Sequence, residues 1–176
     1  MKIIYFIIYN GLVYPAIFLT ALIISAFNKK LRQSIKGKLS AIGELKNYLN
    51  KIDSNSNIYW FHASSLGEFF QVKTVIEKLK EEQDDLICIV SFSSPSGFNN
   101  ANSDAMDLKF YIPFDFPWTI NRVLTEIKPK KIMFASYDLW PNLVWISRLK
   151  GIHVNLYSVK IKKSSLRNNQ ISQYIY

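Results

Sequence analysis

The sequence is poor in the residues that build disulfide and metal sites, because its 176 residues include one cysteine and two histidines. A single cysteine excludes an intramolecular disulfide framework, and Cys88 lies in the apolar run 86–92, where an inert core residue is expected. No metal-ligand spacing of histidine, cysteine and carboxylate is present, so we predict no metal site. The six glycines form neither G-x-G-x-x-G nor a Walker lysine motif, and we expect no cofactor.

Charge is missing from the beginning of the chain. Between Ile3 and Phe27 the strongly polar side chains are Asn10, Thr20 and Ser25. About 25 helical residues at 1.5 Å each give roughly 37 Å, enough to span a bilayer with some tilt. We therefore expect residues 1–28 to be a membrane anchor. By the positive-inside rule, the basic cluster that follows predicts a cytoplasmic location for the rest of the chain: Lys29, Lys30, Arg32, Lys36 and Lys38.

Three other interpretations compete for this apolar segment. A cleaved signal peptide is disfavoured by the length of the segment, by Pro15 and by the lack of a small-x-small cleavage site. A buried core helix of this length is expected to show a polar face, which is lacking. A monotopic helix lying in the interface agrees with Tyr5, Tyr9 and Tyr14, so spanning and lying flat both stay open.

Acidic residues are outnumbered, with 13 against 22 lysines and arginines, and the net charge is +9. The excess gathers in residues 29–51 and 160–167. No groove-reading helix motif, zinc knuckle or RNA-binding sheet signature accompanies it, so we expect no nucleic-acid partner. A surface of anionic lipid head groups explains the charge more simply, and the membrane is the predicted partner.

The remainder of the chain alternates between strand and helix patterns. Residues 29–57 read as a basic juxtamembrane helix, to about Asn50, and a polar linker. Short apolar runs then alternate with amphipathic segments, which predicts a parallel sheet covered on both faces. We therefore predict an α/β, Rossmann-like domain over residues 58–176. Its expected strands are 58–63, 86–92, 108–112, 131–135 and 153–158, and its expected helices are 66–83, 96–103, 118–127 and 139–150.

In such sheets ligands bind at the carboxyl ends of the strands, where four loops meet: 62–68, 93–97, 113–117 and 136–142. In the first loop, Glu68 lies in the first turn of a helix, where the helix dipole favours an ionised carboxylate able to accept a proton from a hydroxyl. The same residues, Ser65 to Glu68, match the capping box S-x-x-E, so a structural role competes with a catalytic one.

The other loops also carry polar residues with two interpretations each. Ser94, Ser96 and Gly97 surround the start of a short helix, where backbone N–H groups bind an anion or are simply capped. Asp138 either binds substrate or complements a helix dipole. His62 ends a strand beside Glu68, and a lone histidine there is more often hydrogen-bonded structure than a catalyst.

Four motifs follow one another along these loops: WFHA-x-S-x-GE at 60–68, S/T-P-S/T-G at 94–97, P-x-D at 113–115 and LWPN at 139–142. In this order, behind an apolar segment, they resemble the N-terminal half of the 3-deoxy-D-manno-octulosonate (Kdo) transferases of lipopolysaccharide synthesis. Four ordered matches are more specific than any one of them.

The resemblance implies a GT-B glycosyltransferase with inverting transfer and no metal on the nucleotide sugar. Its N-terminal domain takes the lipid A precursor, and its C-terminal domain takes the donor CMP-Kdo. The family's general base corresponds to Glu68, which favours catalysis over capping. The resemblance also implies the cytoplasmic face of a bacterial inner membrane, and the basic segments would suit a phosphorylated lipid acceptor. Substrate-binding residues are expected at His62, Ser64, Ser65, Ser94, Ser96, Gly97, Asp138, Trp140 and Lys160.

The sequence departs from the family pattern in three places. Many members have Glu-x-Glu before LWPN, where this chain has Ser136, Tyr137 and Asp138, so only the second acid is kept. Lys160 replaces an arginine, which weakens any bidentate contact with carboxylate or phosphate. The chain stops at Tyr176, before the expected donor domain, so we expect no sugar transfer by this chain alone.

Three functions therefore stay open. The leading one is the acceptor half of a Kdo transferase, as a piece of a longer enzyme or a part of a split one. The second is a non-catalytic remnant that holds acidic lipid at the membrane. The third is the acceptor half of another GT-B lipid glycosyltransferase.

Overall fold

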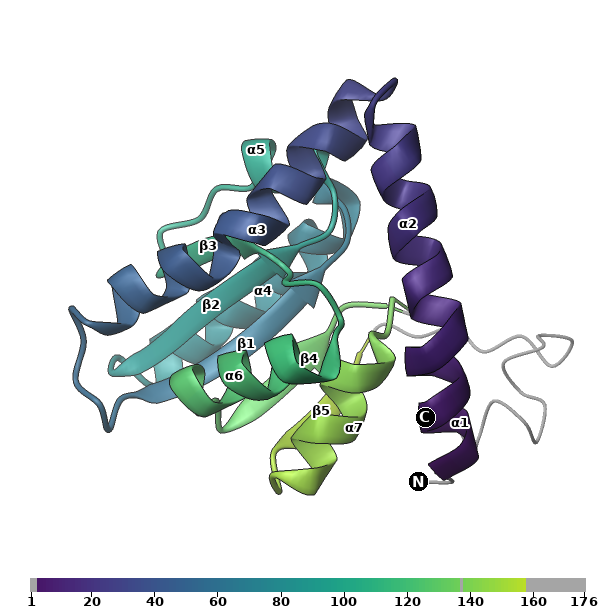
Figure 1. The fold of residues 1–176 in the computed structure, drawn as a ribbon. Coiled ribbons are helices and arrows are strands. Elements are labelled where there is room, and N and C mark those ends of the chain that lie inside the picture. Colours follow the sequence, from purple (N-terminus) through teal and green to yellow (C-terminus); the bar gives the residue numbers. More distant parts are fainter. Residues whose placement is uncertain (1–2, 137, 158–176) are drawn as a thin grey trace, which may run out of the picture.

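The computed structural model describes residues 3–136 and 138–157, and its centre is a five-stranded parallel sheet (Figure 1). The spatial order β3-β2-β1-β4-β5 is that of a Rossmann-like half, so the predicted fold class is confirmed. The strands are β1 (Asn57–Ala63), β2 (Leu86–Phe92), β3 (Leu108–Tyr111), β4 (Lys131–Phe134) and β5 (His153–Leu156).

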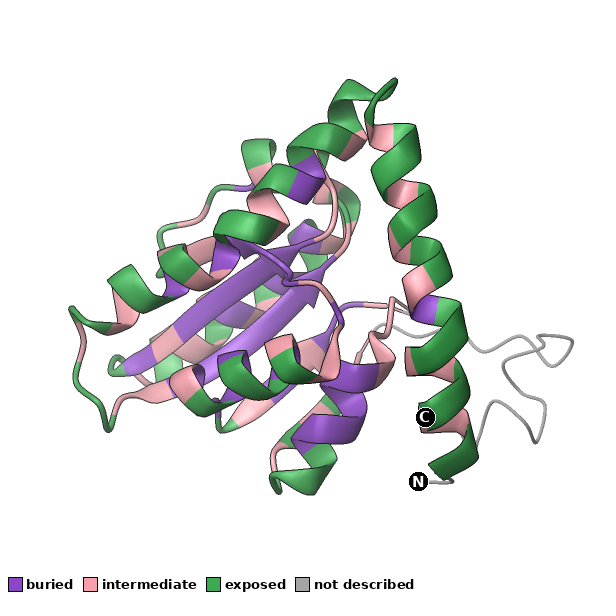
Figure 2. Cartoon of the chain, in the orientation of Figure 1, coloured by how far each residue is buried: buried purple, intermediate pink, exposed green. Residues whose placement is uncertain are grey.

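Helices cover both faces of the sheet, as the near-continuous apolar strands require. Successive side chains of β1 alternate between the faces, and both Trp60 and Phe61 are fully buried. Figure 2 shows the central strands of the sheet coloured mostly as buried. Trp60 packs in the core beneath α3 (Lys29–Leu49), α6 (Pro117–Ile127) and α7 (Pro141–Leu149). Phe61 packs in the opposite core with α4 (Leu66–Glu82), and α5 (Pro95–Asn100) lies next to α4.

Helix α3 confirms the helix predicted from Lys29 to about Asn50, and Asn28 caps it by accepting a hydrogen bond from the Leu31 N–H at 3.1 Å. Its buried side chains include Ala41 and Leu45, which belong to the core around Trp60. The segment expected to link the anchor to the domain is therefore also one of the layers of that domain.

The apolar N-terminal segment is helical throughout its described part. It consists of α1 (Ile3–Ile8), a π-helical turn η1 (Tyr9–Val13) and α2 (Tyr14–Ser25), with a mean hydropathy of 2.0. Within the described residues it is the one helix long and apolar enough to cross a membrane, a weak indication of membrane association. α2 meets α3 at a sharp corner, so that the two form an inverted V (Figure 1).

The predicted helix boundaries hold to within a few residues. The largest shift at a site loop is in α7, which begins at Pro141 and not at Leu139. Proline has no N–H to donate and its fixed φ suits the first helical turn, so Leu139 and Trp140 stay in the preceding loop.

Candidate functional site

Glu68 lies at the carboxyl edge of the sheet, in the first turn of α4. One carboxylate oxygen, Oε2, accepts hydrogen bonds from the Ser64 N–H at 2.6 Å and from the Ser64 hydroxyl at 2.7 Å. Ser65 is the N-cap, since its hydroxyl accepts a hydrogen bond from the Glu68 N–H at 3.3 Å. In the predicted capping box, the Glu68 side chain would accept a hydrogen bond from the N–H of the N-cap, Ser65. It accepts instead from Ser64, one residue earlier, and so fixes the loop between β1 and α4.

The two carboxylate oxygens of Glu68 differ in their hydrogen bonds. Within residues 3–136 and 138–157, no hydrogen bond to Oε1 is found, and the side chain is partly exposed. The hydrogen bonds that hold the loop therefore involve only one of the two carboxylate oxygens. The geometry allows Glu68 both roles.

His62 is almost fully buried and lies at the centre of a polar cluster formed by loops far apart in sequence. Its Nδ1 lies 2.9 Å from the Ser91 hydroxyl, which also accepts a hydrogen bond from the Trp60 indole at 2.8 Å. Its Nε2 lies 3.4 Å from Asp138 Oδ2 and 3.2 Å from the Trp140 indole nitrogen. The structure therefore brings together His62, Asp138 and Trp140, as predicted for one edge of the sheet.

The Asp138 carboxylate joins this cluster to Glu68. Burial opposes its ionisation, but hydrogen bonds from His62, Ser64 and Ser93 outweigh burial and lower the pKa of Asp138 well below its usual value. The Ser93 hydroxyl donates to Asp138 Oδ2 at 3.1 Å. Because Ser64 contacts both carboxylates, Asp138 and Glu68 share one hydrogen-bonded network, with Asp138 held ionised at neutral pH.

Lys38 is the residue at this edge that sequence reasoning placed wrongly. It was grouped with the basic residues facing lipid, whereas its ammonium donates to the Ile112 carbonyl at 3.1 Å and lies 4.4 Å from the centre of the Trp140 ring. Burial lowers the pKa of Lys38 to about 7, although the charges of Asp138 and Asp115 act in the opposite direction. Its spacing from Ser34, Ala41 and Leu45, all buried on one face of α3, was the available signal.

The loop from Ser94 to Gly97 is explained by packing and capping. The Ser94 hydroxyl accepts a hydrogen bond from the Gly97 N–H at 3.1 Å, and the Ser94 N–H donates to the Ser64 carbonyl at 3.1 Å. A Cβ at Gly97 would lie 2.7 Å from the Phe92 ring and 3.2 Å from the Ser65 backbone. Ser96 is exposed, and its backbone carbonyl accepts a hydrogen bond from the Asn100 side-chain amide at 2.9 Å. The loop thus buttresses the start of α4.

Of two further positions, one was predicted from the sequence and one was not. Lys160 lies outside the described residues, so its predicted role stays a prediction. Tyr157, which was not predicted, follows β5, and its buried hydroxyl has no hydrogen-bond partner within the described chain. Burial raises the pKa of Tyr157, and the negative charge of Glu68 adds to this.

The P-x-D motif supports the start of α7. Asp115 is fully buried, and its carboxylate accepts hydrogen bonds from the backbone N–H groups of Asn142 at 3.0 Å and Leu143 at 3.1 Å. Its third donor is the Tyr9 hydroxyl of the N-terminal helix at 2.9 Å. Burial raises the pKa of Asp115 to about 7, with these hydrogen bonds and Lys38 opposing the shift.

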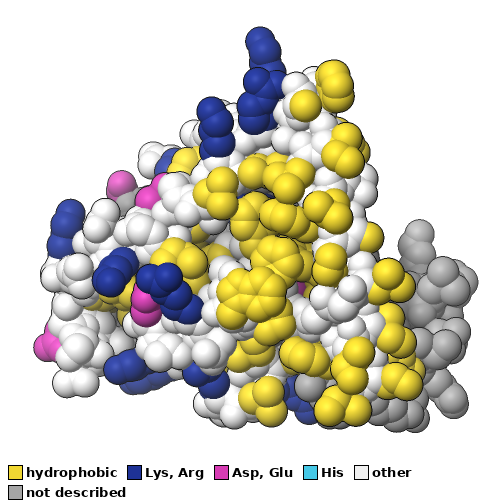
Figure 3. All heavy atoms as spheres, in the orientation of Figure 1, with side chains coloured by type: hydrophobic (Ala, Val, Ile, Leu, Met, Phe, Trp, Pro, Cys, Tyr) yellow, Lys and Arg dark blue, Asp and Glu magenta, His cyan; other side chains and the backbone are white. Residues whose placement is uncertain are grey.

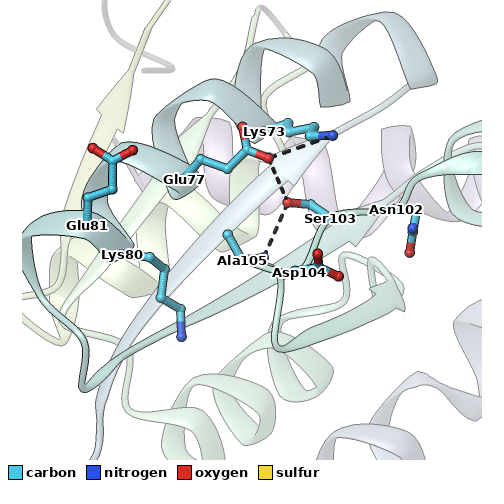
Figure 4. A pocket seen from close by; sticks show the side chains of 8 residues that line it. All are labelled: Lys73, Glu77, Lys80, Glu81, Asn102, Ser103, Asp104 and Ala105. Carbon is cyan, nitrogen blue, oxygen red and sulfur yellow. Dashed lines mark hydrogen bonds and ion pairs between the residues drawn. The ribbon is translucent and has the colours of Figure 1, made fainter.

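An open hollow of about 560 Å³ lies elsewhere, between the second half of α4 and the loop before β3 (Figure 4). The charged side chains that α4 contributes pair with neighbours: Glu77 Oε1, for example, lies 3.7 Å from the Lys73 ammonium and accepts a hydrogen bond from the Ser103 hydroxyl at 3.2 Å. It contains no predicted site residue and lies toward the amino ends of the strands, so it does not belong to the candidate site.

The 3-2-1-4-5 parallel sheet, with ionisable and hydroxyl side chains gathered at its carboxyl edge, defines a Rossmann-like ligand-binding domain. A glycosyltransferase N-domain family model, described as 3-deoxy-D-manno-octulosonic-acid transferase (kdotransferase), matches residues 35–175. The chain therefore belongs to the Kdo transferase family.

Curated relatives agree with this assignment. A 3-deoxy-D-manno-octulosonic acid transferase of Aquifex aeolicus is 29% identical over 101 residues, covering 56% of this chain and 28% of the relative. The Bordetella pertussis protein of the same name is 28% identical over 115 residues, covering 61% and 26%. A mitochondrial protein of Arabidopsis thaliana, named as a probable transferase of this kind, is 29% identical over 113 residues, covering 63% and 25%. The chain thus matches about a quarter of the length of these relatives.

Proposed function

We propose that this chain is the acceptor-binding half of a membrane-attached, inverting GT-B Kdo transferase that transfers Kdo from CMP-Kdo to lipid A precursor in lipopolysaccharide synthesis. Family membership supports the reaction class. The family match over residues 35–175 includes Glu68 and the carboxyl-edge loops. The donor nucleotide would then be held by the part of the enzyme outside this match.

Glu68 is the proposed general base, and the observation that carries this proposal is the division between its two oxygens. Ser64 fixes Oε2 with two short hydrogen bonds, which orients the carboxylate and leaves Oε1 for the acceptor hydroxyl. In the reaction the acceptor oxygen forms a bond to the anomeric carbon of Kdo while the bond from that carbon to the CMP phosphate breaks. The hydroxyl proton passes to Glu68.

His62 and Asp138 have positioning roles in this proposal. Their hydrogen bonds are to each other and to Ser91, Ser93 and Trp140, and Ser64 connects them to Glu68. Ser65 and Ser94 cap helices, and Gly97 allows close packing, so these three shape the loop around Glu68.

The exposed basic residues of α3 are proposed to meet the anionic acceptor lipid. Lys29, Lys30 and Lys36 are exposed, whereas Lys38 is engaged within the domain. Charge reversal at Lys36 should therefore weaken acceptor binding without unfolding the chain. Unchanged acceptor affinity in a Lys36→Glu variant would refute this contact.

One observation favours a second function. Both hydrogen bonds of Glu68 Oε2 serve the β1–α4 loop, as expected of a structural cap. A non-catalytic protein that holds acidic lipid would need no more of Glu68 than this.

The proposed function is tested by mixing the full chain, in detergent, with a separately expressed donor half of a Kdo transferase, and assaying Kdo transfer from CMP-Kdo to lipid A precursor. Transfer in the mixture and not with either half alone supports the proposal. Absence of transfer in a mixture whose halves are both folded, with lipid binding retained, favours the non-catalytic alternative.

A further inference from the structure

The N-terminal helix is docked on the domain along one face. Phe6 lies against Trp145, with ring centres 5.7 Å apart, and Phe18 lies edge-on to Phe114 at 5.1 Å. Between them the contacts are polar, through Tyr9, Asn10 and Tyr14. The contacting positions 6, 10, 14 and 18 recur every four residues, as expected for one side of a helix.

The polar contacts are reciprocal and buried or partly buried. The Asn10 and Asn142 side chains exchange two amide hydrogen bonds, at 3.0 and 2.7 Å. The Tyr9 hydroxyl donates to the Asp115 carboxylate, and the Tyr14 hydroxyl accepts from the Asp115 N–H at 2.6 Å. If the helix left the domain for hydrocarbon, these amide and hydroxyl groups would lose their partners, at a cost on the order of 1–3 kcal/mol each. Docking is therefore favoured in a lipid environment as well as in water.

The π-helical turn η1 keeps the docked face in line. Four residues of an α-helix advance about 400°, so a contact row at every fourth residue drifts by about 40° per step. Within η1 the Tyr14 N–H bonds to the Tyr9 carbonyl, five residues back, and this wider turn advances less per residue. The turn thus brings Asn10 and Tyr14 onto the same side of the helix. It lies just before Pro15, which has no N–H to donate to a helical hydrogen bond, so a local change in the bonding pattern suits this position.

While the helix is docked, the part of it beyond the contacts is too short to cross a bilayer. Its contacts extend from Phe6 to Phe18, and the apolar residues beyond them are 19–27. The helix ends at Ser25, so seven helical residues cover roughly 10 Å, about a third of the roughly 30 Å of hydrocarbon. A spanning helix would need to break the contacts to Asp115 and Asn142.

The opposite face of this helix is apolar and exposed, and we name it the anchor face. Figure 3 shows its hydrophobic side chains along the helix and beside it, with lysine and arginine side chains near the corner into α3. Exposed fractions reach 72% for Ile3 and 89% for Phe27. The anchor face consists of Ile3, Ile4, Ile7, Ile8, Leu12, Val13, Ile17, Leu19, Leu22, Ile23, Ile24 and Phe27.

The domain adds an aromatic edge to this surface. Trp118 is 69% exposed and stacks on Phe116, with ring centres 4.7 Å apart, and Phe116 packs on Tyr14 and Phe18. Indole rings are typical of membrane interfaces, and a large apolar helical face ending in Lys29 and Lys30 suits anionic head groups. These features suit a lipid leaflet as the surroundings of the anchor face.

We propose that residues 3–27 lie in the plane of one leaflet, docked to the domain through Tyr9, Asn10 and Tyr14, with the anchor face and Trp118 in contact with anionic phospholipid. Both ends of the helix then stay on the same side of the membrane as the domain. Attachment of this kind does not depend on the catalytic role of Glu68.

The test uses the full chain with one epitope tag before Met1 and a second after Tyr176, in inverted inner-membrane vesicles treated with protease from outside. In-plane attachment predicts flotation with the vesicles and loss of both tags. Protection of the N-terminal tag alone would show that the helix spans the bilayer and would overturn the proposal, as would failure to float.

Docking in the membrane is tested by a short bifunctional thiol reagent in a Cys88→Ser background. We expect an intramolecular cross-link in the Asn10→Cys, Asn142→Cys pair and little in the control pair Leu12→Cys, Asn142→Cys, because Leu12 belongs to the anchor face. Equal cross-linking of the two pairs, or none in the first, would overturn the docked geometry. Efficient dimer formation by Leu12→Cys alone would show that a second copy, and not lipid, covers the anchor face.

Discussion

Replacement of Asp115 by alanine should destabilise the chain strongly, because one fully buried carboxylate serves three donors. Two of the donors are N–H groups at the start of α7, and the third is the Tyr9 hydroxyl of the N-terminal helix. Each donor left without an acceptor costs about 2 kcal/mol, or about 6 kcal/mol for three. Burying a carboxylate is itself unfavourable, so its removal offsets part of this cost. We therefore expect the free energy of unfolding to fall by about 3 kcal/mol at pH 8.

The loss of stability in Asp115→Ala should depend on pH, and the pKa of the Asp115 carboxyl sets the direction. Burial raises the pKa of Asp115 from 3.8 to about 7, so the folded state holds its proton more tightly than the unfolded state. The stability gained from this proton is fully present below about pH 4 and disappears as pH rises to about 7. The difference between wild type and Asp115→Ala should therefore be larger at pH 5 than at pH 8.

The assay is urea unfolding in detergent, followed by circular dichroism at both pH values. Tyr9→Phe removes one of the three donors and should cost about 1 kcal/mol, and the exposed Asp104→Ala should change stability by less than about 0.5 kcal/mol. An Asp115→Ala variant as stable as wild type, or a difference that grows from pH 5 to pH 8, would refute this account of the buried carboxylate.

Two further variants test other parts of the fold and site. Gly97→Ala should lower the free energy of unfolding by about 1–3 kcal/mol, because the new Cβ would meet Phe92 and the Ser65 backbone. The control Gly43→Ala lies in α3, where a Cβ has open space, and it should raise the free energy of unfolding by up to about 1 kcal/mol. Equal effects of the two variants in urea unfolding would contradict the close packing at Gly97. Burial lowers the pKa of Lys38 to about 7, so between about pH 7 and pH 10 the folded state binds less proton than the unfolded state, and the thermal stability of the wild type should rise with pH. Lys38→Met should remove this rise. A rise of the same size in the variant would assign it to another group.

The strands follow from local patterns in the sequence, whereas their spatial order is a finding of the structure. Apolar runs predicted all five strands to within two residues. In β1 and β2 these runs are nearly continuous, because strands buried on both faces leave no room for polar alternation. The start of α7 was placed two residues early, because apolar spacing continues through Leu139 and Trp140 while the backbone turns at Pro141.

The polar network of the site could be predicted only in outline. Capping of α4 by Ser65 is a local motif and was predicted, but the bonding of Glu68 to Ser64 depends on the backbone path of the loop. His62 meets Ser91 through the register of β1 and β2, in which these residues are direct partners. No local pattern contains that information.

The docking of the N-terminal helix was not predicted for the same reason. Tyr9 and Asp115 are 106 positions apart in sequence, and the hydrophobic segment by itself is compatible with both spanning and lying flat. Asn10, Tyr9 and Tyr14 were noted as polar interruptions of that segment, and the structure gives each of them a partner in the domain.

The central claim is that Glu68 is the general base of a Kdo transferase acceptor domain, and the most direct measurement is the rate of Kdo transfer by the Glu68→Gln chain mixed with a donor half. Glutamine keeps a carbonyl oxygen to accept from Ser64 but cannot take up the proton. We expect kcat to fall by about 10²–10⁴-fold, with acceptor affinity and melting temperature close to wild type. Transfer within a few-fold of wild type would contradict the claim, and a loss of transfer that only parallels a loss of folding would assign Glu68 to capping of α4.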